Sequence, residues 1–284
     1  MPYTPETGVK LYYETHGDPA HPTLVLISGG GAQLIGWDEH LITALVAEDL
    51  HVVCFDNRDV GFSQRFGGKR DTDGGYDLID LAQDILRVLD AIGVDAAHLV
   101  GHSMGGMMAQ LVAIHHPGRV RSLGLLSTLP GQDPRYVLHA TGEDLRLPVF
   151  PVPKKQAVAF AVRAIEELPL RRYDPQIEWH REKAALAYDR GFAPEGFARQ
   201  WSALLRAPER LDALREVTVP TLVFHGRDDE VVHWCAAVDM AEALSGAELQ
   251  IHPEMGHLIP HELWPELVAG LSRTVRRGEE ALGH

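Results

Sequence analysis

The segment Gly101–Gly105, with the sequence GHSMG, contains residue types that could form a catalytic nucleophile site. A serine hydroxyl is a poor nucleophile until a neighbouring base takes its proton. In a G-x-S-x-G pattern the serine projects from a strained turn between a strand and a helix, and small residues on either side let other chain segments approach the turn. A strand pattern, His98–Gly101, leads into this motif, and a helix pattern, Met104–His116, leaves it. This context predicts that Ser103 is a nucleophile.

A base for this serine is expected on a loop at the same edge of the protein. His257 lies in the loop that directly follows the predicted strand Glu248–His252. Other histidines are less well placed, because His252 lies within that strand and His261 is expected to begin the last helix. His102 is expected to face away from the site on its tight turn. The positions therefore favour His257 as the general base.

An acid is needed to orient the imidazole and to stabilise its charged form. Three consecutive carboxylates, Asp228, Asp229 and Glu230, follow the predicted strand Thr221–His225. Only one of them can perform this role, and the others are expected to face solvent. Position alone leaves Asp228 and Asp229 as alternatives.

Two backbone N–H groups are expected to stabilise the oxyanion of the transition state. The residue after the nucleophile, Met104, supplies one, and the loop after the predicted strand Thr23–Ser28 supplies the other. This loop contains three consecutive glycines, Gly29–Gly31, which allow close approach to a substrate. A phosphate-binding loop is the alternative, but the P-loop Lys-Ser/Thr pair is missing and the spacing differs from G-x-G-x-x-G before a helix.

A metal site is not expected from the histidine pattern. The chain has 16 histidines, but they form no H-E-x-x-H sequence, and the two cysteines are far apart in the chain. We therefore expect no catalytic metal and no cofactor.

Strand and helix signals alternate along most of the chain, which is typical of a mostly parallel sheet with helices on both faces. The predicted strands are Val9–Thr15, Thr23–Ser28, His51–Phe55, His98–Gly101, Arg121–Ser127, Thr221–His225 and Glu248–His252. The predicted core helices are Trp37–Ala47, Leu78–Ile92, Met104–His116, His233–Leu244 and Leu263–Arg276. The alternation stops over residues 129–217.

The segment 129–217 has no convincing buried strand and is predicted to be a helical cap inserted between two core parts, 1–128 and 218–284. Its expected helices are Lys154–Leu168, Pro175–Arg190 and Pro194–Leu205. Ligands of open α/β sheets bind outside the carboxyl ends of the strands, where a cap could exclude water. The aromatic side chains of Trp179, Tyr188, Phe192 and Trp201 are candidate walls of the substrate pocket. The alternative is that they pack the interior of the cap.

Composition and charge exclude several classes of partner. The 284-residue chain is 45% hydrophobic and 23% charged, which is ordinary for a globular protein. Its formal net charge of −14 repels nucleic-acid phosphates and anionic membrane surfaces. The N-terminus has no secretory-signal pattern, and no apolar run is long enough to span a bilayer. We expect a cytoplasmic enzyme with a small-molecule substrate and no nucleic-acid or membrane partner.

Several motifs together resemble a known family. The elbow GHSMGG, the segment Asp56–Ser63, the G-R-D-D-x-V segment from Gly226 and the P-x-M-G-H loop ending at His257 are similar to those of α/β-hydrolase esterases. The similarity is greatest to the aclacinomycin methylesterase-like carboxylesterases. It spans both core segments and is poor across residues 129–217.

The resemblance implies an α/β-hydrolase fold and assigns two roles. In relatives with the pattern G-x-x-D-x-x-V, the triad aspartate is the third residue after the glycine, which corresponds to Asp229. The second oxyanion donor corresponds to Gly30, with Ser28 in place of the usual histidine. The segment Asp56–Ser63 is expected to have a structural role near the site.

The predicted activity is hydrolysis of a carboxylic ester through an acyl-enzyme. The same triad also serves C–C bond hydrolases, lactonases, aminopeptidases, perhydrolases and water-excluding cyclases or acyltransferases, so these remain alternatives. Epoxide hydrolases and haloalkane dehalogenases of this fold usually have an aspartate where this chain has Ser103. A non-catalytic ligand receptor is a further alternative, but the intact Ser, Asp and His set argues against it.

Overall fold

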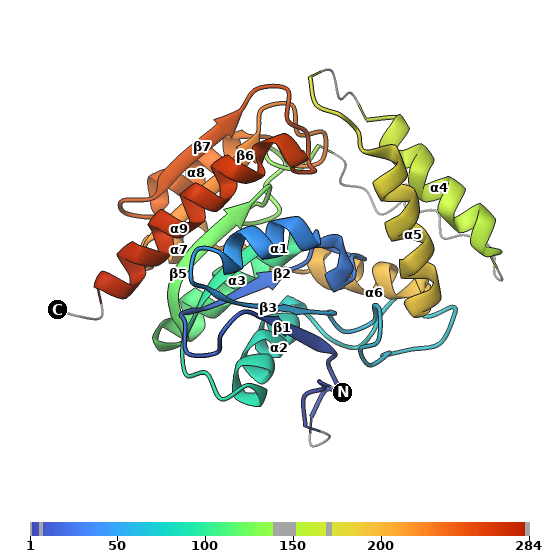
Figure 1. Cartoon of the computed structure of the whole chain (residues 1–284), viewed down its shortest axis with the longest axis horizontal. Coiled ribbons are helices and arrows are strands. Elements are labelled where there is room, and N and C mark those ends of the chain that lie inside the picture. Colours follow the sequence, from blue (N-terminus) through green and yellow to red (C-terminus); the bar gives the residue numbers. More distant parts are fainter. Residues whose placement is uncertain (1, 6–7, 139–151, 169–171, 282–284) are drawn as a thin grey trace.

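The computed structural model describes residues 2–5, 8–138, 152–168 and 172–281, and Figure 1 shows how their elements are arranged. Within these residues, seven strands form one sheet with the order β1-β3-β2-β4-β5-β6-β7. The strands are β1 (Tyr13–His16), β2 (Thr23–Ile27), β3 (His51–Phe55), β4 (Ala97–His102), β5 (Val120–Leu126), β6 (Thr221–Gly226) and β7 (Glu248–His252). Only β1 pairs antiparallel, with β3, and every other pair in this sheet is parallel. The predicted mostly parallel sheet is confirmed.

Helices cover both faces of the sheet, which explains why its central strands are continuous apolar runs. All five residues of β2 and of β3 are buried. The core helices are α1 (Glu39–Val46), α2 (Leu78–Ala91), α3 (Met104–His115), α8 (Cys235–Ala243) and α9 (Trp264–Glu280). Helices α2, α3 and α8 share one hydrophobic cluster with the sheet, and α1 and α9 share the other. Short 3-10 turns occur at Leu34–Gly36, Pro117–Arg119 and His261–Leu263.

Local chemistry explains where the core helices begin and end. The Asp77 side chain accepts hydrogen bonds from the N–H groups of Ile79 and Asp80, and the Asp80 side chain accepts from Asp77 N–H at 3.0 Å. This capping box satisfies N–H groups that lack intrahelical partners at the start of α2. Gly93, with a φ of +72°, follows the end of α2, in a left-handed conformation that is common just after a helix.

Several predicted core elements are shorter in the structure, among them α8, which was predicted over His233–Leu244 and spans Cys235–Ala243. The predicted strand Val9–Thr15 enters the sheet only at Tyr13, because Leu11 N–H donates to Thr4 Oγ1 and Tyr12 N–H donates to Ser63 Oγ. The helix predicted from Trp37 begins at Glu39, because the side chain of Asp38 caps it by accepting His40 N–H at 2.7 Å.

The described part of the segment between β5 and β6 contains four helices: α4 (Lys154–Glu166), α5 (Ile177–Gly191), α6 (Pro194–Leu205) and α7 (Leu211–Leu214). Helices α4 and α5 pack against each other and lie at the edge of the molecule, away from the sheet (Figure 1). The sequence did not predict α7, which contacts α3 and α8 and buries Leu214 in the core. The end of the predicted insertion therefore packs with the sheet layers.

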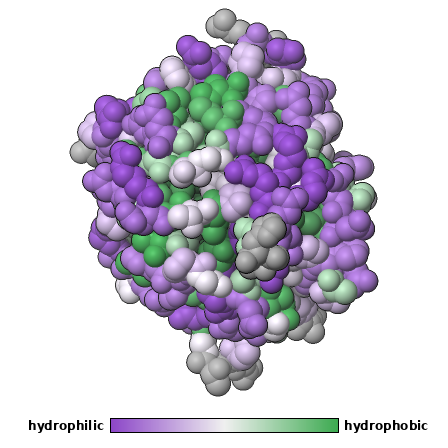
Figure 2. Space-filling view, turned by 90° about the vertical axis from the view of Figure 1, so that its left-hand side faces the viewer, coloured by the Kyte–Doolittle hydropathy of each residue, from purple (hydrophilic) through white to green (hydrophobic). Residues whose placement is uncertain are grey.

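Figure 2 shows one face of the molecule coloured by hydropathy. Hydrophilic residues cover most of this face, and hydrophobic residues form patches between them. No helix among the described residues is long and apolar enough to cross a membrane.

Candidate active site

Ser103 lies at the turn between β4 and α3 with a φ of +53°, a left-handed conformation that is rare for residues other than glycine. The two motif glycines make this turn possible. A Cβ atom on Gly101 would lie 2.2 Å from the Gly105 carbonyl oxygen, and one on Gly105 would lie 2.2 Å from the Ile27 carbonyl oxygen. The strained turn of the G-x-S-x-G pattern is therefore present, and it presents Ser103 at the carboxyl edge of the sheet.

His257 lies in the loop after β7, and the structure places it next to Asp229 in the loop after β6. Its Nδ1 atom is 2.9 Å from Asp229 Oδ2 and 3.1 Å from Oδ1. Asp229 is buried, whereas Asp228 is exposed. The geometry therefore brings Asp229, and not Asp228, to the histidine.

The carboxylate of Asp229 is surrounded by donors. Its Oδ1 atom accepts the N–H groups of Val231 and Val232, both at 2.8 Å, and His225 Nε2 lies 3.2 Å from Oδ2. Burial by itself would raise the pKa of Asp229, but the hydrogen bonds from His225 and His257 outweigh it and hold the pKa well below its usual value. Asp229 therefore stays ionised at neutral pH and can stabilise a charged imidazole.

Ser103 and His257 line the same cavity, but their side chains form no hydrogen bond to each other within the described part of the chain. The hydrogen bonds of the His257 ring go through Nδ1 to Asp229. Its Nε2 atom is the one that would take the serine proton. Catalytic hydrogen bonds of this kind often tighten only in the substrate complex.

Two expectations about neighbouring residues are wrong. Glu230 does not simply face solvent, because its Oε2 atom accepts His257 N–H at 3.2 Å. His102 does not face away from the site: its ring centroid lies 4.9 Å from that of His257, and its Nε2 donates to the His257 carbonyl oxygen at 2.9 Å. Gly29 leaves space for this ring, since a Cβ there would lie 3.3 Å from His102 Nδ1.

The contact with His102 predicts a pH dependence of stability. Burial, together with the charge of His257, lowers the pKa of His102 to about 4 from 6.5. Because the unfolded chain takes up this proton first, stability is lost as the pH falls from about 6.5 towards 4. We expect the free energy of unfolding of the wild type to fall by about 1–3 kcal/mol because of His102. That of His102→Gln should fall less over the same pH range. Urea unfolding between pH 7 and pH 4 measures the difference.

The matched control is His115→Gln, because His115 is an exposed histidine at the end of α3. Its stability curve should run parallel to that of wild type. A His102→Gln curve that also runs parallel would contradict the prediction.

Gly30 and Met104, the two residues expected to supply oxyanion donors, lie side by side. Met104 is the first residue of α3, so its N–H has no acceptor within the helix. Gly30 follows β2, and its N–H donates to no acceptor among the described residues. A Cβ on Gly30 would lie 3.9 Å from Met104 Sδ. Within the described ranges neither N–H is paired, so both can bind a ligand oxygen.

A cavity of about 540 Å³ opens beside Ser103 and His257. Its core wall includes residues 28–33, and its opposite wall comes mainly from α5. The α5 residues that line it follow the helical period and are Trp179, His180, Lys183, Ala184 and Ala187. Trp179 is therefore a cavity wall, and its Nε1 donates to the carboxylate of Asp38, another lining residue.

Tyr188, Phe192 and Trp201, also predicted as pocket walls, are not among the residues that line this cavity. Tyr188 is one position beyond the lining face of α5, and its hydroxyl donates to the Val152 carbonyl oxygen at 2.8 Å. Its ring stacks on Phe192 at 5.3 Å. Trp201 packs against the hydrophobic cluster that α2, α3 and α8 share with the sheet. Adjacent residues of a helix point about 100° apart, which turns Tyr188 out of the cavity wall, whereas no residue of α6 lines this cavity.

The segment Asp56–Ser63 has the structural role that was expected of it. Asp56 Oδ2 accepts from Arg190 of α5 at 2.7 Å, and Asp59 Oδ1 accepts from Arg199 of α6 at 2.7 Å. All four of these side chains are buried. The two ion pairs therefore fix the inserted helices to the loop that follows β3.

Sequence reasoning missed His225 and Gln200, two fully buried polar residues near the site. His225 ends an otherwise apolar strand and contacts the acid, so a polar residue in that strand was an available signal. Gln200 lies in α6, where its contacts depend on how the helix packs, and nothing in its local sequence identifies them.

Comparison with known proteins agrees with this fold. Residues 22–262 match the model of the alpha/beta hydrolase fold family. Because this match covers most of the chain, the protein belongs to the alpha/beta hydrolase fold family.

Two kinds of relative are most informative. A protein of Variovorax paradoxus assigned as carbamate hydrolase RutD is 30% identical over 255 residues, which is 88% of this chain and 90% of that protein. Rhodomycin D methylesterase DauP of a Streptomyces species is 38% identical over 118 residues, or 42% of this chain and 39% of that enzyme. The expected relationship to α/β-hydrolase methylesterases is thus confirmed.

Solved structures support the fold. A carboxylesterase of Nitrososphaera gargenis superimposes with a TM-score of 0.76 at 23% identity, covering 97% of this chain and 99% of that chain. A meta-cleavage product hydrolase of Pseudomonas fluorescens superimposes with a TM-score of 0.72 at 21% identity, covering 99% and 98%. At these identities the similarity shows the fold and not the substrate.

Proposed function

We propose that this protein is a serine hydrolase that cleaves a carboxylic ester through an acyl-enzyme intermediate. One observation carries the proposal: the strained Ser103 lines the same cavity as His257, which is paired with the buried Asp229, and two N–H groups that are unpaired among the described residues lie next to Ser103. These are the nucleophile, base, orienting acid and oxyanion site that acyl transfer requires.

In the proposed mechanism, Ser103 Oγ attacks the ester carbonyl carbon while His257 Nε2 takes the hydroxyl proton. The N–H groups of Gly30 and Met104 stabilise the oxyanion, and Asp229 stabilises the imidazolium. Collapse of the tetrahedral intermediate breaks the C–O bond, and His257 returns the proton to the departing alcohol. Water, deprotonated by His257, then hydrolyses the acyl-enzyme by the same steps and releases the acid.

The relatives support two substrate classes. Rhodomycin D methylesterases support ester cleavage, although they match less than half of the chain. RutD relatives match 88% of the chain, including the cap region. Carbamate hydrolysis on the same residues is therefore the second candidate.

The experiment is a substrate panel that distinguishes these classes. Purified protein is assayed with p-nitrophenyl esters of graded chain length, aryl methyl esters, lactones, aryl carbamates and a vinylogous diketone for C–C cleavage. A serine-directed fluorophosphonate is applied in parallel, and the labelled peptide is identified by mass spectrometry. Label on Ser103 with the highest kcat/KM on methyl or alkyl esters supports the proposal. Labelling of Ser103 without ester turnover would instead support another of the activities that use the same triad.

We further propose that residues 129–217 act as a cap that determines which substrates fit. Trp179 gives a direct test, because it lines the cavity and contacts Asp38 on the core side. Trp179→Ala should enlarge this wall and shift the ratio of kcat/KM between bulky and small esters by roughly tenfold in favour of the bulky ones. The measurement is kcat/KM over the graded ester series.

Phe160→Ala is the control, because Phe160 is a 76% exposed aromatic residue of α4 that does not line the cavity. It should leave the order of preference unchanged. An unchanged order in folded Trp179→Ala would contradict a role of this wall in selection.

A further inference from the structure

The glycine loop after β2 is held by a side chain from α6. Gln200 is completely buried, and its Oε1 atom accepts the N–H of Gly31 at 2.7 Å. Gly31 adjoins Gly30 in the chain and adopts a φ of +73°. This hydrogen bond therefore fixes the peptide plane next to the candidate oxyanion donor.

A loop of three glycines is weakly held by its own backbone, because glycine allows more backbone conformations than any other residue, and the bond across this loop, from Ala32 N–H to the Gly29 carbonyl oxygen, is long at 3.3 Å. Oxyanion donors help catalysis only if they are already oriented before charge develops. A contact from outside the loop is therefore needed to hold its N–H groups in place. The buried amide of Gln200 supplies such a contact without placing a charge there.

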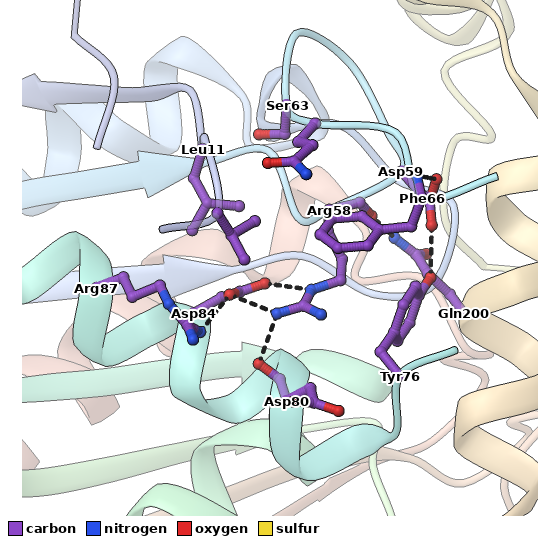
Figure 3. A network of polar contacts seen from close by, with 12 residues as sticks. Leu11, Arg58, Asp59, Ser63, Phe66, Tyr76, Asp80, Asp84, Arg87 and Gln200 are labelled. Carbon is purple, nitrogen blue, oxygen red and sulfur yellow. Dashed lines mark hydrogen bonds and ion pairs between the residues drawn. The ribbon is translucent and has the colours of Figure 1, made fainter. Parts of the chain in front are cut away.

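The other end of the Gln200 amide is anchored as firmly. Its Nε2 donates to the Arg58 carbonyl oxygen at 2.7 Å. The Arg58 side chain points the opposite way, toward α2, where it makes two hydrogen bonds of 2.7 Å to Asp84 and one of 3.0 Å to the Asp80 carbonyl oxygen (Figure 3). A continuous chain of contacts thus runs from α2 through Arg58 and Gln200 to the glycine loop.

Helix α6 approaches this region closely enough to make the contact specific. A Cβ on Gly196 would lie 2.1 Å from the Asp59 carbonyl oxygen, so only glycine fits there. One turn later, Arg199 pairs with Asp59, and Phe197 packs on the glycine loop, 3.0 Å from where a Gly31 Cβ would lie. These contacts fix the position of Gln200 relative to both loops.

We propose that Gln200 is a positioning residue for the oxyanion site, acting through the Gly31 N–H to orient the N–H of Gly30. This inference rests on the proposed function, since it assigns a task within acyl transfer. It also gives part of the inserted segment a role in the chemical step. The effect should fall on kcat, because the interaction strengthens with charge that develops only in the transition state.

The test compares Gln200→Met, which removes both hydrogen bonds at similar volume, with Gln200→Glu, which keeps an acceptor for Gly31. Gln132→Met is the matched control, because Gln132 Nε2 also bonds α6, at the Leu204 carbonyl oxygen 3.1 Å away, without touching the glycine loop. For each variant, kcat and KM are measured on one activated ester, together with inhibition by a trifluoromethyl ketone. This inhibitor forms a tetrahedral oxyanion on the serine. Thermal unfolding reports stability.

We expect Gln200→Met to lower kcat about 10- to 100-fold and to weaken the inhibitor similarly, with KM changed less than about threefold. Gln200→Glu should lie within about fivefold of wild type, and Gln132→Met should match wild type. Unchanged kcat in Gln200→Met would overturn the proposal even if its melting temperature falls. If Gln200→Met does not fold, a Gln200→Glu variant that folds but loses kcat more than tenfold would overturn it, and near-normal kcat would support it. Failure of wild type to react with fluorophosphonate would instead refute the proposed function.

Discussion

Ser103→Ala is expected to lower kcat by about 10⁴- to 10⁶-fold while leaving the fold intact. The reason is that alanine has no oxygen to form the acyl-enzyme, so only the oxyanion site and substrate binding remain to help water attack. Alanine also costs little in packing at this turn, because the contacts that form it are made by the flanking glycines and by backbone atoms. The measurement is single-substrate kinetics on the best ester of the panel.

Substrate binding is the control measurement for Ser103→Ala. Substrate affinity should stay close to the wild-type value, because the cavity wall and the N–H groups of Gly30 and Met104 are unchanged. Circular dichroism should match wild type, and fluorophosphonate labelling should disappear. Retention of most of the wild-type kcat would refute an acyl-enzyme on Ser103.

Asp229→Asn is expected to lower kcat by about 10³- to 10⁴-fold. An asparagine can turn its NH₂ group toward His257 Nδ1, which favours the tautomer that carries the proton on Nε2. That tautomer cannot accept the serine proton. The variant also lacks the buried negative charge that stabilises the imidazolium, a charge maintained by the low pKa of Asp229. The measurement is kcat on one activated ester with circular dichroism as the folding check.

Asp228→Asn is the matched control, because it makes the same chemical change one residue earlier on an exposed side chain. The backbone N–H of Asp228 donates a hydrogen bond to the Met255 carbonyl oxygen at 3.0 Å, and this bond does not involve the carboxylate. We expect kcat within about twofold of wild type. A large loss at Asp228 together with near-normal activity at Asp229 would show that the orienting acid is misassigned. Comparable moderate losses would show that the two carboxylates replace one another.

The sequence by itself determined the core of the fold and the location of the site. Buried parallel strands are continuous apolar runs, so β2 and β3 could be read directly, and the amphipathic pattern of Leu78–Ile92 predicted α2 to within one residue. The strained turn at Ser103 could be predicted from the segment Gly101–Gly105 alone, because the glycines that the turn needs flank the serine. Such features depend on residues close together in the chain.

Only the tertiary structure decided which side chains meet. Asp228 and Asp229 have the same chemistry, so position in the chain left both open and only the family resemblance favoured Asp229; backbone direction in the loop after β6 buries Asp229 and exposes Asp228. Tyr188 and Trp179 lie on the same helix, and the rotation of α5 places only Trp179 in the cavity wall.

Gln200 is the clearest case of this dependence on packing. It meets Gly31, a residue 169 positions earlier in the chain, because α6 packs closely on the loop after β3, where only a glycine at position 196 fits against the Asp59 carbonyl oxygen. Helical and strand periods are local, so they predict that a residue is buried but not its distant neighbour. That neighbour is fixed by the packing of whole elements, which forms only when the chain is folded.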